Sequence, residues 1–388
     1  MRVALLTREY PPEVYGGAGV HVTHLVEQLA KLVDVEVQCF GAPRAEVGVR
    51  AYRPWEAIPA DRADETALQA VSVDLLMASG CRGTDLVHSH TWYANLGGHL
   101  ASLLHRIPHV MTAHSLEPLR PWKREQLGGG YELALFCERT AVHGAAAIVA
   151  VSAGMRGDLL ATYPAVDPDR VVVIHNGIDT DAWRPAPDTG ALARLGIDGA
   201  RPSVVFVGRI TRQKGVDHAL AAAESISREA QVVLCAGAPD TPEIGAEMRQ
   251  LAASVAARRG GIVWIEEMLS PDDLRQVLTA ATVFICPSAY EPFGLTNLEA
   301  MACETAVVAS AVGGIPEIVV EDETGHLVPY VGDHVAFAAA VAGRVNALLA
   351  DPDRAAAMGR AGRLRAIEHF GWPAVGARTV QLYETLVS

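Results

Sequence analysis

The sequence predicts an α/β protein built from two parallel β-sheets, each covered by helices on both faces. Short apolar segments of strand length alternate with segments whose apolar residues recur at helical spacing, which is typical of parallel sheets. This pattern runs through residues 2–174 and begins again at Ser203, after a stretch rich in Asp, Pro and Gly. The length of 388 residues also exceeds what one ordinary hydrophobic core accommodates.

The first series opens with an apolar strand at Arg2–Thr7, a glycine-rich loop over 9–19 and a helix over 20–33. The loop contains the tetrad 16–19, Gly-Gly-Ala-Gly, which does not match the dinucleotide-binding motif GxGxxG. Its glycines would instead let the backbone approach another ligand closely. Further expected elements are strands at Asp85–His88, His109–Thr112, Ala146–Val151 and Val171–Ile174, and a helix at Glu132–His143.

The second series follows residues 176–199, which we interpret as a linker between domains. Its expected elements are strands at Val204–Val207, Gln231–Ala236, Ile262–Ile265, Thr282–Cys286 and Ala306–Ala309, a helix at Val216–Ile226 and a tight turn at Gly313–Glu317. From Phe337 onward the chain is alanine-rich and predicted helical, with breaks near Asp351-Pro352 and Trp372-Pro373.

Composition excludes several classes of protein. Half of the residues are apolar and a fifth are charged, as in a globular protein. The formal net charge of −13 argues against a nucleic-acid or acidic-membrane partner. The six cysteines form no CxxC pair, so we expect no zinc or redox motif and a reducing, cytoplasmic compartment. We expect no signal peptide, because the N-terminal apolar run Val3–Leu6 is short and Arg8 and Glu9 follow it. We expect no membrane span, because no apolar run approaches about 18 residues.

The stretch from Ser288 to Cys303 is the strongest candidate site. It follows an apolar strand, and Gly294 is expected to begin a helix that carries Glu299, with Glu291 in the preceding turn. The first amides of a helix have no internal partner and bind anions, whereas carboxylates accept hydrogen bonds from sugar hydroxyls. The stretch therefore suggests a ligand with both phosphate and sugar; the alternative is a loop carboxylate and a solvated helix face.

Two cations stand at another strand-to-helix turn. Arg209 ends the predicted strand at Val204–Val207, and Lys214 precedes the next helix. Cations beside helix amides suit a diphosphate, although the P-loop order GxxxxGK[ST] is absent. The alternative is a pair of solvated surface cations.

Three histidines, His88, His90 and His114, are expected at the carboxyl ends of strands, where ligands of parallel sheets gather. His88 and His90 resemble a pair of metal ligands, but no further ligand has a metal-site spacing. We therefore prefer strand-end polar residues, assign no metal ligand, and favour His114 as a substrate contact.

A loop between His114 and Tyr131 contains Arg120, Lys123 and Arg124 together with a triple glycine. Such a loop is either a phosphate clamp or a flexible, solvated surface segment.

Taken together, these motifs resemble the family 4 glycosyltransferases, which have the GT-B fold. The resemblance covers nearly the whole chain and rests on Gly16-Gly17, Asn176-Gly-Ile-Asp179, Gly208-Arg209 with Lys214-Gly215, and above all Glu291-Pro-Phe-Gly294 with Glu299, the family's E-x7-E motif. It implies two Rossmann-like domains facing a cleft: an acceptor-side domain (1–185), a nucleotide-sugar-binding domain (200–370) and a C-terminal helix (371–388) that returns to the first domain.

The resemblance also implies the roles of the site residues on the donor. Arg209 and Lys214 would bind its diphosphate, with the amides of Gly294 and Leu295, and Glu299 would hold its ribose.

For the reaction itself, the resemblance places His114 beside the reacting sugar and Glu291 on hydroxyls of the transferred sugar. Gly17 would let the backbone approach the phosphate. Members of the family need no metal or cofactor and retain the anomeric configuration, with the leaving diphosphate helping to take the acceptor proton. Glu291 is therefore not assigned as a covalent nucleophile.

Longer runs resemble one actinobacterial group in the family, the α-maltose-1-phosphate synthases, formerly labelled glycogen synthases. These runs are residues 7–19, 113–122 and 125–130. The resemblance implies glucose transfer from ADP-glucose to glucose 1-phosphate, and Arg120, Lys123 and Arg124 would then hold the acceptor phosphate. Classical bacterial glycogen synthases carry a lysine where this chain has Val14, which counts against the glucan-elongating type.

Several alternatives stay open at this point. The chain resembles glycogen synthases that elongate an α-1,4-glucan, and enzymes that act on another sugar phosphate or inositol phosphate. A nicotinamide-dependent oxidoreductase is disfavoured because GxGxxG is absent, and a catalytically inactive sensor because the site motifs are intact. The sequence does not separate ADP-glucose from UDP-glucose, and a homodimer remains an open alternative.

Overall fold

The computed structural model describes residues 1–14, 16–59 and 62–387, which divide into two compact units. Unit 1 comprises Met1–Gly177 together with the C-terminal segment from Trp372, and unit 2 comprises Ile178–Gly371. Tyr15, within the run 7–19, and Ser388, the last residue of the expected C-terminal helix, lie outside the described residues.

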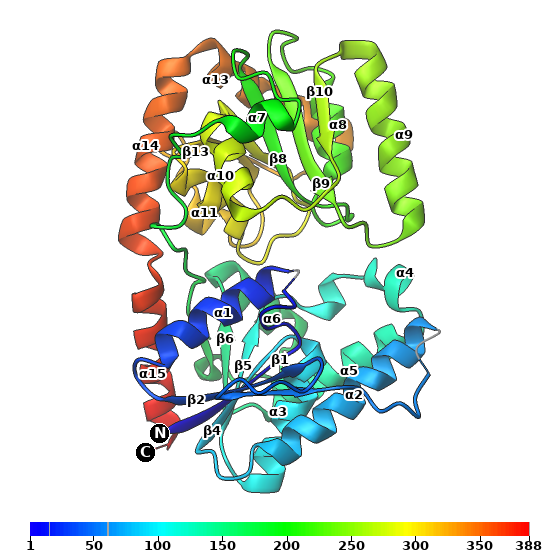
Figure 1. The fold of residues 1–388 in the computed structure, drawn as a ribbon, viewed down its shortest axis with the longest axis vertical. Coiled ribbons are helices and arrows are strands. Elements are labelled where there is room, and N and C mark those ends of the chain that lie inside the picture. The colour runs from blue at the N-terminus through cyan, green and yellow to red at the C-terminus, as the bar shows by residue number, and fades with distance from the viewer. Residues whose placement is uncertain (15, 60–61, 388) are drawn as a thin grey trace. The chain divides into compact units, whose positions relative to one another are not determined.

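Unit 1 is built on a seven-stranded sheet with the order β3-β2-β1-β4-β5-β6-β7, in which all neighbouring strands are parallel (Figure 1). Its strands are β1 (Arg2–Thr7), β2 (Asp34–Phe40), β3 (Val49–Tyr52), β4 (Leu86–His90), β5 (His109–Ala113), β6 (Ala147–Ala150) and β7 (Val171–Val173). Its helices are α1 (Gly17–Leu29), α2 (Ala63–Gly80), α3 (Trp92–His105), η1 (Glu117–Leu119), α4 (Lys123–Leu127), α5 (Gly130–Gly144), α6 (Ala153–Thr162), η2 (Pro168–Arg170) and α15 (Trp372–Val387).

The alternation of side chains along β1 gives unit 1 two cores. Val3 and Leu5 pack with α1 and the C-terminal helix α15, whereas Ala4 and Leu6 pack with α2 and α3 on the other face. Figure 1 shows α15, in red, alongside α1. The end of the chain therefore completes the core of the unit in which the chain begins.

Unit 2 repeats the architecture with a six-stranded parallel sheet of order β10-β9-β8-β11-β12-β13 (Figure 1). Its strands are β8 (Ser203–Arg209), β9 (Gln231–Gly237), β10 (Ile262–Ile265), β11 (Val283–Cys286), β12 (Ala306–Ser310) and β13 (Gly325–Val328). Its helices are α7 (Gly190–Arg194), α8 (Val216–Ala223), α9 (Pro242–Arg259), α10 (Pro271–Ala280), α11 (Leu295–Ala302), α12 (Ile315–Ile318), α13 (His334–Ala350) and α14 (Pro352–His369).

The structure confirms the predicted fold class and corrects the bounds of one helix and the interpretation of the linker. The helix expected over 20–33 begins at Gly17 and ends at Leu29. Residues 178–199, interpreted as a linker, instead pack on unit 2, where the amides of Ala186 and Ala191 donate to the side chains of Thr279 and Gln276 of α10.

None of the described helices is, alone, both long and apolar enough to cross a membrane. The pair α13 and α14 passes that test jointly on length and composition, with a bend of 104° between the two helices.

Candidate active site

In unit 2, two loops bring Lys214 and Glu291 together. Lys214 Nζ donates to Glu291 Oε2 at 2.6 Å, and Ser288 Oγ donates to the same oxygen at 3.1 Å. The Glu291 side chain is 7% exposed and that of Lys214 25%. Burial is the largest single influence on the Lys214 ammonium and lowers its pKa. The attraction of Glu291 and Cys286 and the hydrogen bond to Glu291 together outweigh burial, so the net shift of the pKa is upward. The pair is therefore a cation and a carboxylate, ready to bind a ligand bearing both charge and hydroxyl groups.

Glycines allow these loops to approach so closely. Gly215, with a φ of +69°, caps α8, and a Cβ at this position would lie 2.2 Å from the carbonyl oxygen of Pro287. Gly313 has a φ of +53°, and a Cβ there would lie 1.9 Å from the carbonyl oxygen of Glu291. That same oxygen accepts a hydrogen bond from the Gly314 amide at 3.0 Å. The absence of a side chain at Gly215 and at Gly313 thus lets the backbone pack closely beside both members of the ion pair.

Arg209 is the last residue of β8, at the carboxyl edge of the sheet. Its guanidinium pairs with the buried carboxylate of Asp240, which follows β9, and its own side chain is 34% exposed. Arg209 also acts electrostatically on Lys214. The two predicted diphosphate cations therefore lie at the same edge of one sheet, each held by its own carboxylate.

Glu299 lies on the first turns of α11, the helix that Gly294 caps. Burial raises the pKa of its carboxyl group to about 8, while Lys214 acts to lower it. Leu295 is the first residue of the same helix, whose opening amides lack intrahelical acceptors. The predicted strand, turn and helix at 282–303 are confirmed, and Arg209, Lys214, Glu291, Gly294, Leu295 and Glu299 gather around them.

Three further residues of this site escaped sequence reasoning. Asp240 holds Arg209, and Ser288 holds Glu291. Asn297 is fully buried and acts as a side-chain hydrogen-bonding neighbour of the Cys286 thiol, although within the described part of the chain no bond of normal geometry reaches its amide. A poorly satisfied buried amide beside Gly294 favours a polar site. Only the three-dimensional contacts reveal it, because Asn297 reads in the sequence as an ordinary helical residue.

In unit 1, His114 follows β5 and lies against two other histidines. Its Nε2 is 2.9 Å from Nδ1 of His90, the last residue of β4. Burial, with His88, lowers the pKa of His114 to about 3, so its ring is neutral. The residue is nevertheless partly exposed at the surface. The prediction for His88 is corrected: it lies inside β4, buried, and its two ring nitrogens are bonded to Tyr383 Oη (2.6 Å) and Thr112 Oγ1 (2.7 Å).

Gly17 is exposed and is the first residue of α1, where opening amides are available to a ligand. The preceding residue, Gly16, donates its amide to Glu9 Oε2 at 2.8 Å. A carboxylate from the chain itself therefore already lies at this helix start.

The structure gives each cation of the basic loop a separate partner. Arg120 pairs with the buried Glu117 at 3.0 Å. Lys123 is buried and donates to Gln126, and Arg124 pairs with Glu132 at 2.8 Å on the surface. The three cations are thus not one open cluster, and an anion would have to replace these internal partners.

Comparison with protein families matches both units. Residues 15–182 match the model described as Glycosyltransferase Family 4, and residues 191–365 match Glycosyl transferases group 1.

Relatives of high identity extend over the same length. The chain is 58% identical over 387 residues to the alpha-maltose-1-phosphate synthase of Mycolicibacterium smegmatis, and 56% identical to that of Mycobacterium tuberculosis. Both alignments cover 99% of this chain and 99% of the relative. It is 30% identical to the D-inositol 3-phosphate glycosyltransferase of Corynebacterium aurimucosum, covering 100% of this chain and 97% of the relative.

Solved structures agree with the fold. A sucrose-phosphate synthase from Thermosynechococcus elongatus superimposes with a TM-score of 0.79 at 27% identity, covering 99% of this chain and 98% of the other. The Anabaena protein HepE in complex with UDP-glucose gives a TM-score of 0.80 at 18% identity over the whole of both chains and supports the fold alone. The chain therefore belongs to the family 4 glycosyltransferases of the GT-B fold, in the group of the alpha-maltose-1-phosphate synthases.

Proposed function

We propose that this glycosyltransferase moves glucose from ADP-glucose to α-glucose 1-phosphate with retention of configuration, which produces α-maltose 1-phosphate for α-glucan synthesis. The transfer would need neither a metal ion nor a cofactor. The six cysteines are free and buried, which supports a reducing compartment such as the cytoplasm.

The observation that carries the transfer chemistry is the Lys214–Glu291 pair beside the start of α11. Breaking the bond to a nucleoside diphosphate develops negative charge on the leaving phosphate. Lys214, Arg209 and the amides at Gly294 and Leu295 would bind this charge as it develops, and this is how preorganised groups lower such barriers. When Lys214 turns toward phosphate, Glu291 is released to accept hydrogen bonds from hydroxyls of the transferred sugar.

The remaining donor and sugar contacts follow from position and charge. Glu299 would accept hydrogen bonds from the donor ribose, and the neutral ring of His114 would contact the reacting sugar. Gly17 would let the phosphate approach the first amides of α1. The leaving diphosphate itself would take the acceptor proton, so Glu291 has no nucleophilic role.

The acceptor rests on the relatives rather than on geometry. The names of the 56–58% identical relatives support glucose 1-phosphate, and Val14, where classical glycogen synthases carry a lysine, supports it as well. Relatives named D-inositol 3-phosphate glycosyltransferase, at 30–33% identity, also support a small phosphorylated acceptor.

The test measures nucleoside diphosphate release from ADP-glucose and from UDP-glucose, each with glucose 1-phosphate or glycogen as acceptor. Mass spectrometry identifies the product, and NMR of its new anomeric centre decides retention. We expect a disaccharide phosphate from ADP-glucose in the presence of a chelator. Transfer to glycogen alone would establish a polymer synthase and overturn the proposed acceptor.

A second experiment tests the acceptor loop. We propose that Arg120, Lys123 and Arg124 hold the acceptor phosphate after exchange of their internal partners. Lys123→Ala and Arg124→Ala should each raise the KM for glucose 1-phosphate about tenfold, the effect of losing one charge-assisted hydrogen bond of about 1.5 kcal/mol. Lys31→Ala, at an exposed residue just past the end of α1, is the control. An unchanged acceptor KM in both loop variants would remove this loop from the site.

A further inference from the structure

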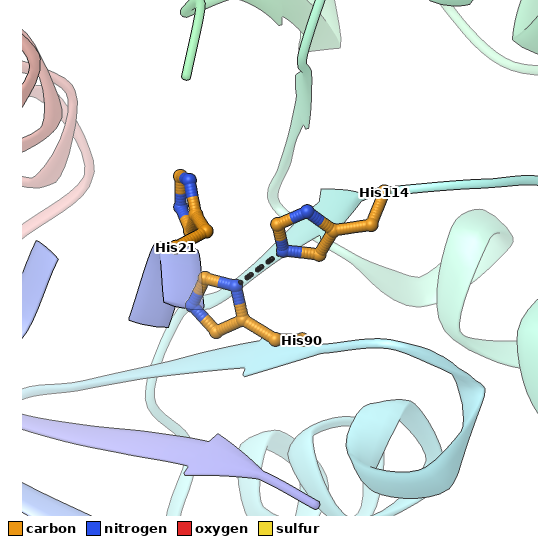
Figure 2. Close-up of side chains that lie close together, drawn as sticks. All are labelled: His21, His90 and His114. Atoms are coloured by element: carbon orange, nitrogen blue, oxygen red, sulfur yellow. Dashed lines mark hydrogen bonds between the residues drawn. The ribbon is translucent and has the colours of Figure 1, made fainter. Parts of the chain in front are cut away.

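Three imidazoles from three separate segments of unit 1 converge. His21 lies on α1, His90 ends β4, and His114 follows the neighbouring strand β5. Figure 2 shows the three side chains side by side, with the hydrogen bond between His90 and His114. One ring nitrogen from each residue lies within 4.8 Å of the others.

The separations are close to those of a metal site. The ring centroid of His21 is 4.8 Å from that of His114 and 5.6 Å from that of His90, and the His90–His114 nitrogens are 2.9 Å apart. Nitrogen ligands about 2.0–2.1 Å from a tetrahedral zinc ion lie about 3.3 Å from one another. Ring rotations that move the nitrogens by about an ångström would therefore bring all three onto one ion.

Unsatisfied polar atoms mark the same place. Among the described residues, His90 Nε2 and His21 Nδ1 are buried without a hydrogen-bond partner. Asn176 lies beside His21 and acts on its ring as a side-chain hydrogen-bonding neighbour, although no bond of normal geometry reaches its buried Oδ1. Buried polar atoms are normally well paired, so poorly satisfied nitrogens on two rings of one histidine cluster point to a ligand.

The chemistry of the cluster selects the kind of ion. Burial keeps the rings neutral, and neutral imidazole binds zinc, copper, nickel and cobalt, whereas magnesium and calcium prefer oxygen ligands. The charged groups that act on the His21, His90 and His114 rings are other histidines. His88 is not a ligand, because both of its nitrogens are bonded elsewhere. His114 is partly exposed, which gives access to the cluster and leaves a fourth position for water or an anion.

We propose that His21, His90 and His114 bind a divalent transition-metal ion of the zinc class, and that the bound ion inhibits glycosyl transfer by withdrawing His114 from the substrate. The site was invisible in the sequence because its members lie far apart in the chain and share no metal-motif spacing. The binding itself is independent of the proposed function, whereas the inhibition rests on the role proposed there for His114.

The binding test uses zinc ion alone, titrated calorimetrically into chelator-treated full-length protein. We expect one site that His21→Gln and His90→Gln each weaken at least about tenfold, since even losing an outer partner of a metal ligand costs 10- to 100-fold. His24→Gln, one turn further along α1, and His334→Gln, which disrupts the separate group Asp217, His218 and His334, should bind zinc as the parent does. The proposal would be overturned if His21→Gln and His90→Gln bound zinc with the parent's affinity, or if His334→Gln lost the site.

A measurement on the unmodified protein keeps the test valid if a variant fails to fold. Zinc X-ray absorption should give three imidazole ligands, and fewer than three would reject the site.

The inhibition is measured as nucleoside diphosphate release with increasing zinc. We expect zinc to inhibit the parent protein, and His21→Gln to need at least tenfold more zinc for half inhibition. If zinc is bound by three imidazoles but glycosyl transfer is not slowed, the inhibitory role is overturned while the metal site itself stands. Absence of transfer with every acceptor, zinc or not, would count against the proposed function, while calorimetry still decides the metal site.

Discussion

Lys214 and Arg209 each hold a carboxylate before any ligand is present, and this fixes what single substitutions should do. Lys214 pairs with Glu291 and Arg209 with Asp240. In the proposed function, a diphosphate would exchange with these partners, and each carboxylate places its cation beforehand. The residues that hold the cations therefore matter almost as much as the cations themselves.

Arg209→Ala and Lys214→Ala should each lower kcat/KM about 10²- to 10³-fold, the effect of removing one group that binds charge in a transition state. Steady-state kinetics with the nucleotide sugar measure this, and circular dichroism checks that the fold is intact. Arg212→Ala, in the same turn but 48% exposed and 3.8 Å from Glu247, is the matched control and should keep most of the activity. Near-normal turnover in either test variant would mean that the diphosphate lies elsewhere.

The raised pKa of Glu299 predicts a pH dependence of donor binding. Because burial raises that pKa to about 8, the carboxyl group is mostly protonated at pH 7 and becomes ionised as the pH rises through 8. In the role proposed for Glu299, an ionised carboxylate would accept hydrogen bonds from the ribose hydroxyls better than a protonated one, so the donor KM should fall between pH 7 and pH 9. Glu299→Gln cannot ionise and should show a raised donor KM without that fall. The same pH slope in Glu299→Gln would assign the titration to another group.

Sequence reasoning reached the chemistry of these residues but not their pairing. Glu291, Glu299, Arg209 and Lys214 were identifiable because strand-turn-helix patterns and charge placed them at ligand-binding positions. The ion pairs of Arg209 with Asp240 and of Lys214 with Glu291 join separate segments of the chain, which no local pattern reports. In the basic loop, the density of charge in the sequence suggested a single cluster of cations. In the structure, Arg120 instead forms an ion pair with Glu117, because the local turn of η1 brings the two side chains together.

At the scale of elements, the turn at Gly215 positions the site by close backbone approach, and Gly196 offers a matched control. The two glycines have nearly the same left-handed φ, +69° and +72°. A Cβ at Gly215 would lie 2.2 Å from Pro287, whereas one at Gly196 meets nothing within 4 Å. The pair thus separates the strain of the backbone from the effect of the contact.

Gly196→Ala should cost about 1–2 kcal/mol of unfolding free energy and leave transfer unchanged, because only the left-handed conformation is penalised. Gly215→Ala should cost more and should also raise the donor KM, because the turn must shift and carry Lys214 away from Glu291. Urea unfolding and steady-state kinetics on the two variants decide this. Equal stability losses with equal activity would show that the contact with Pro287 does not position the site.

Elements were predictable where their apolar pattern was long and continuous. The strands β1, β5, β9 and β11 read directly from apolar runs. The structure adds β3 and β13, edge strands of four residues each, whose alternation is too short to distinguish from a loop. The helices α2 and α9 were equally hidden because polar residues are spread around them, and packing on the sheets decides their place.

For the whole molecule, the chain returns at its end to the unit where it began. Trp372, Val375 and Tyr383 of α15 pack in one core with Val3 and Leu5 of β1. The break at Trp372-Pro373 was readable in the sequence, but the destination of the helix came only from the resemblance to a family, because no local pattern states which sheet an apolar helix covers.

The packing of α15 on the sheet has a polar contact at its centre. Tyr383 is fully buried, and its hydroxyl lies 2.6 Å from His88 Nδ1. Tyr383→Phe keeps the packing but leaves His88 with one buried, unpaired nitrogen, which costs about 1–3 kcal/mol. Urea unfolding should show this loss, whereas Tyr330→Phe, at a 37% exposed tyrosine, should change the unfolding free energy by less than about 0.5 kcal/mol. His88 also bonds Thr112, and its ring centroid lies 4.3 Å from that of His90, so the same substitution should weaken zinc binding at His21, His90 and His114. A Tyr383→Phe protein as stable as its parent would show that apolar packing alone holds the C-terminal helix on unit 1.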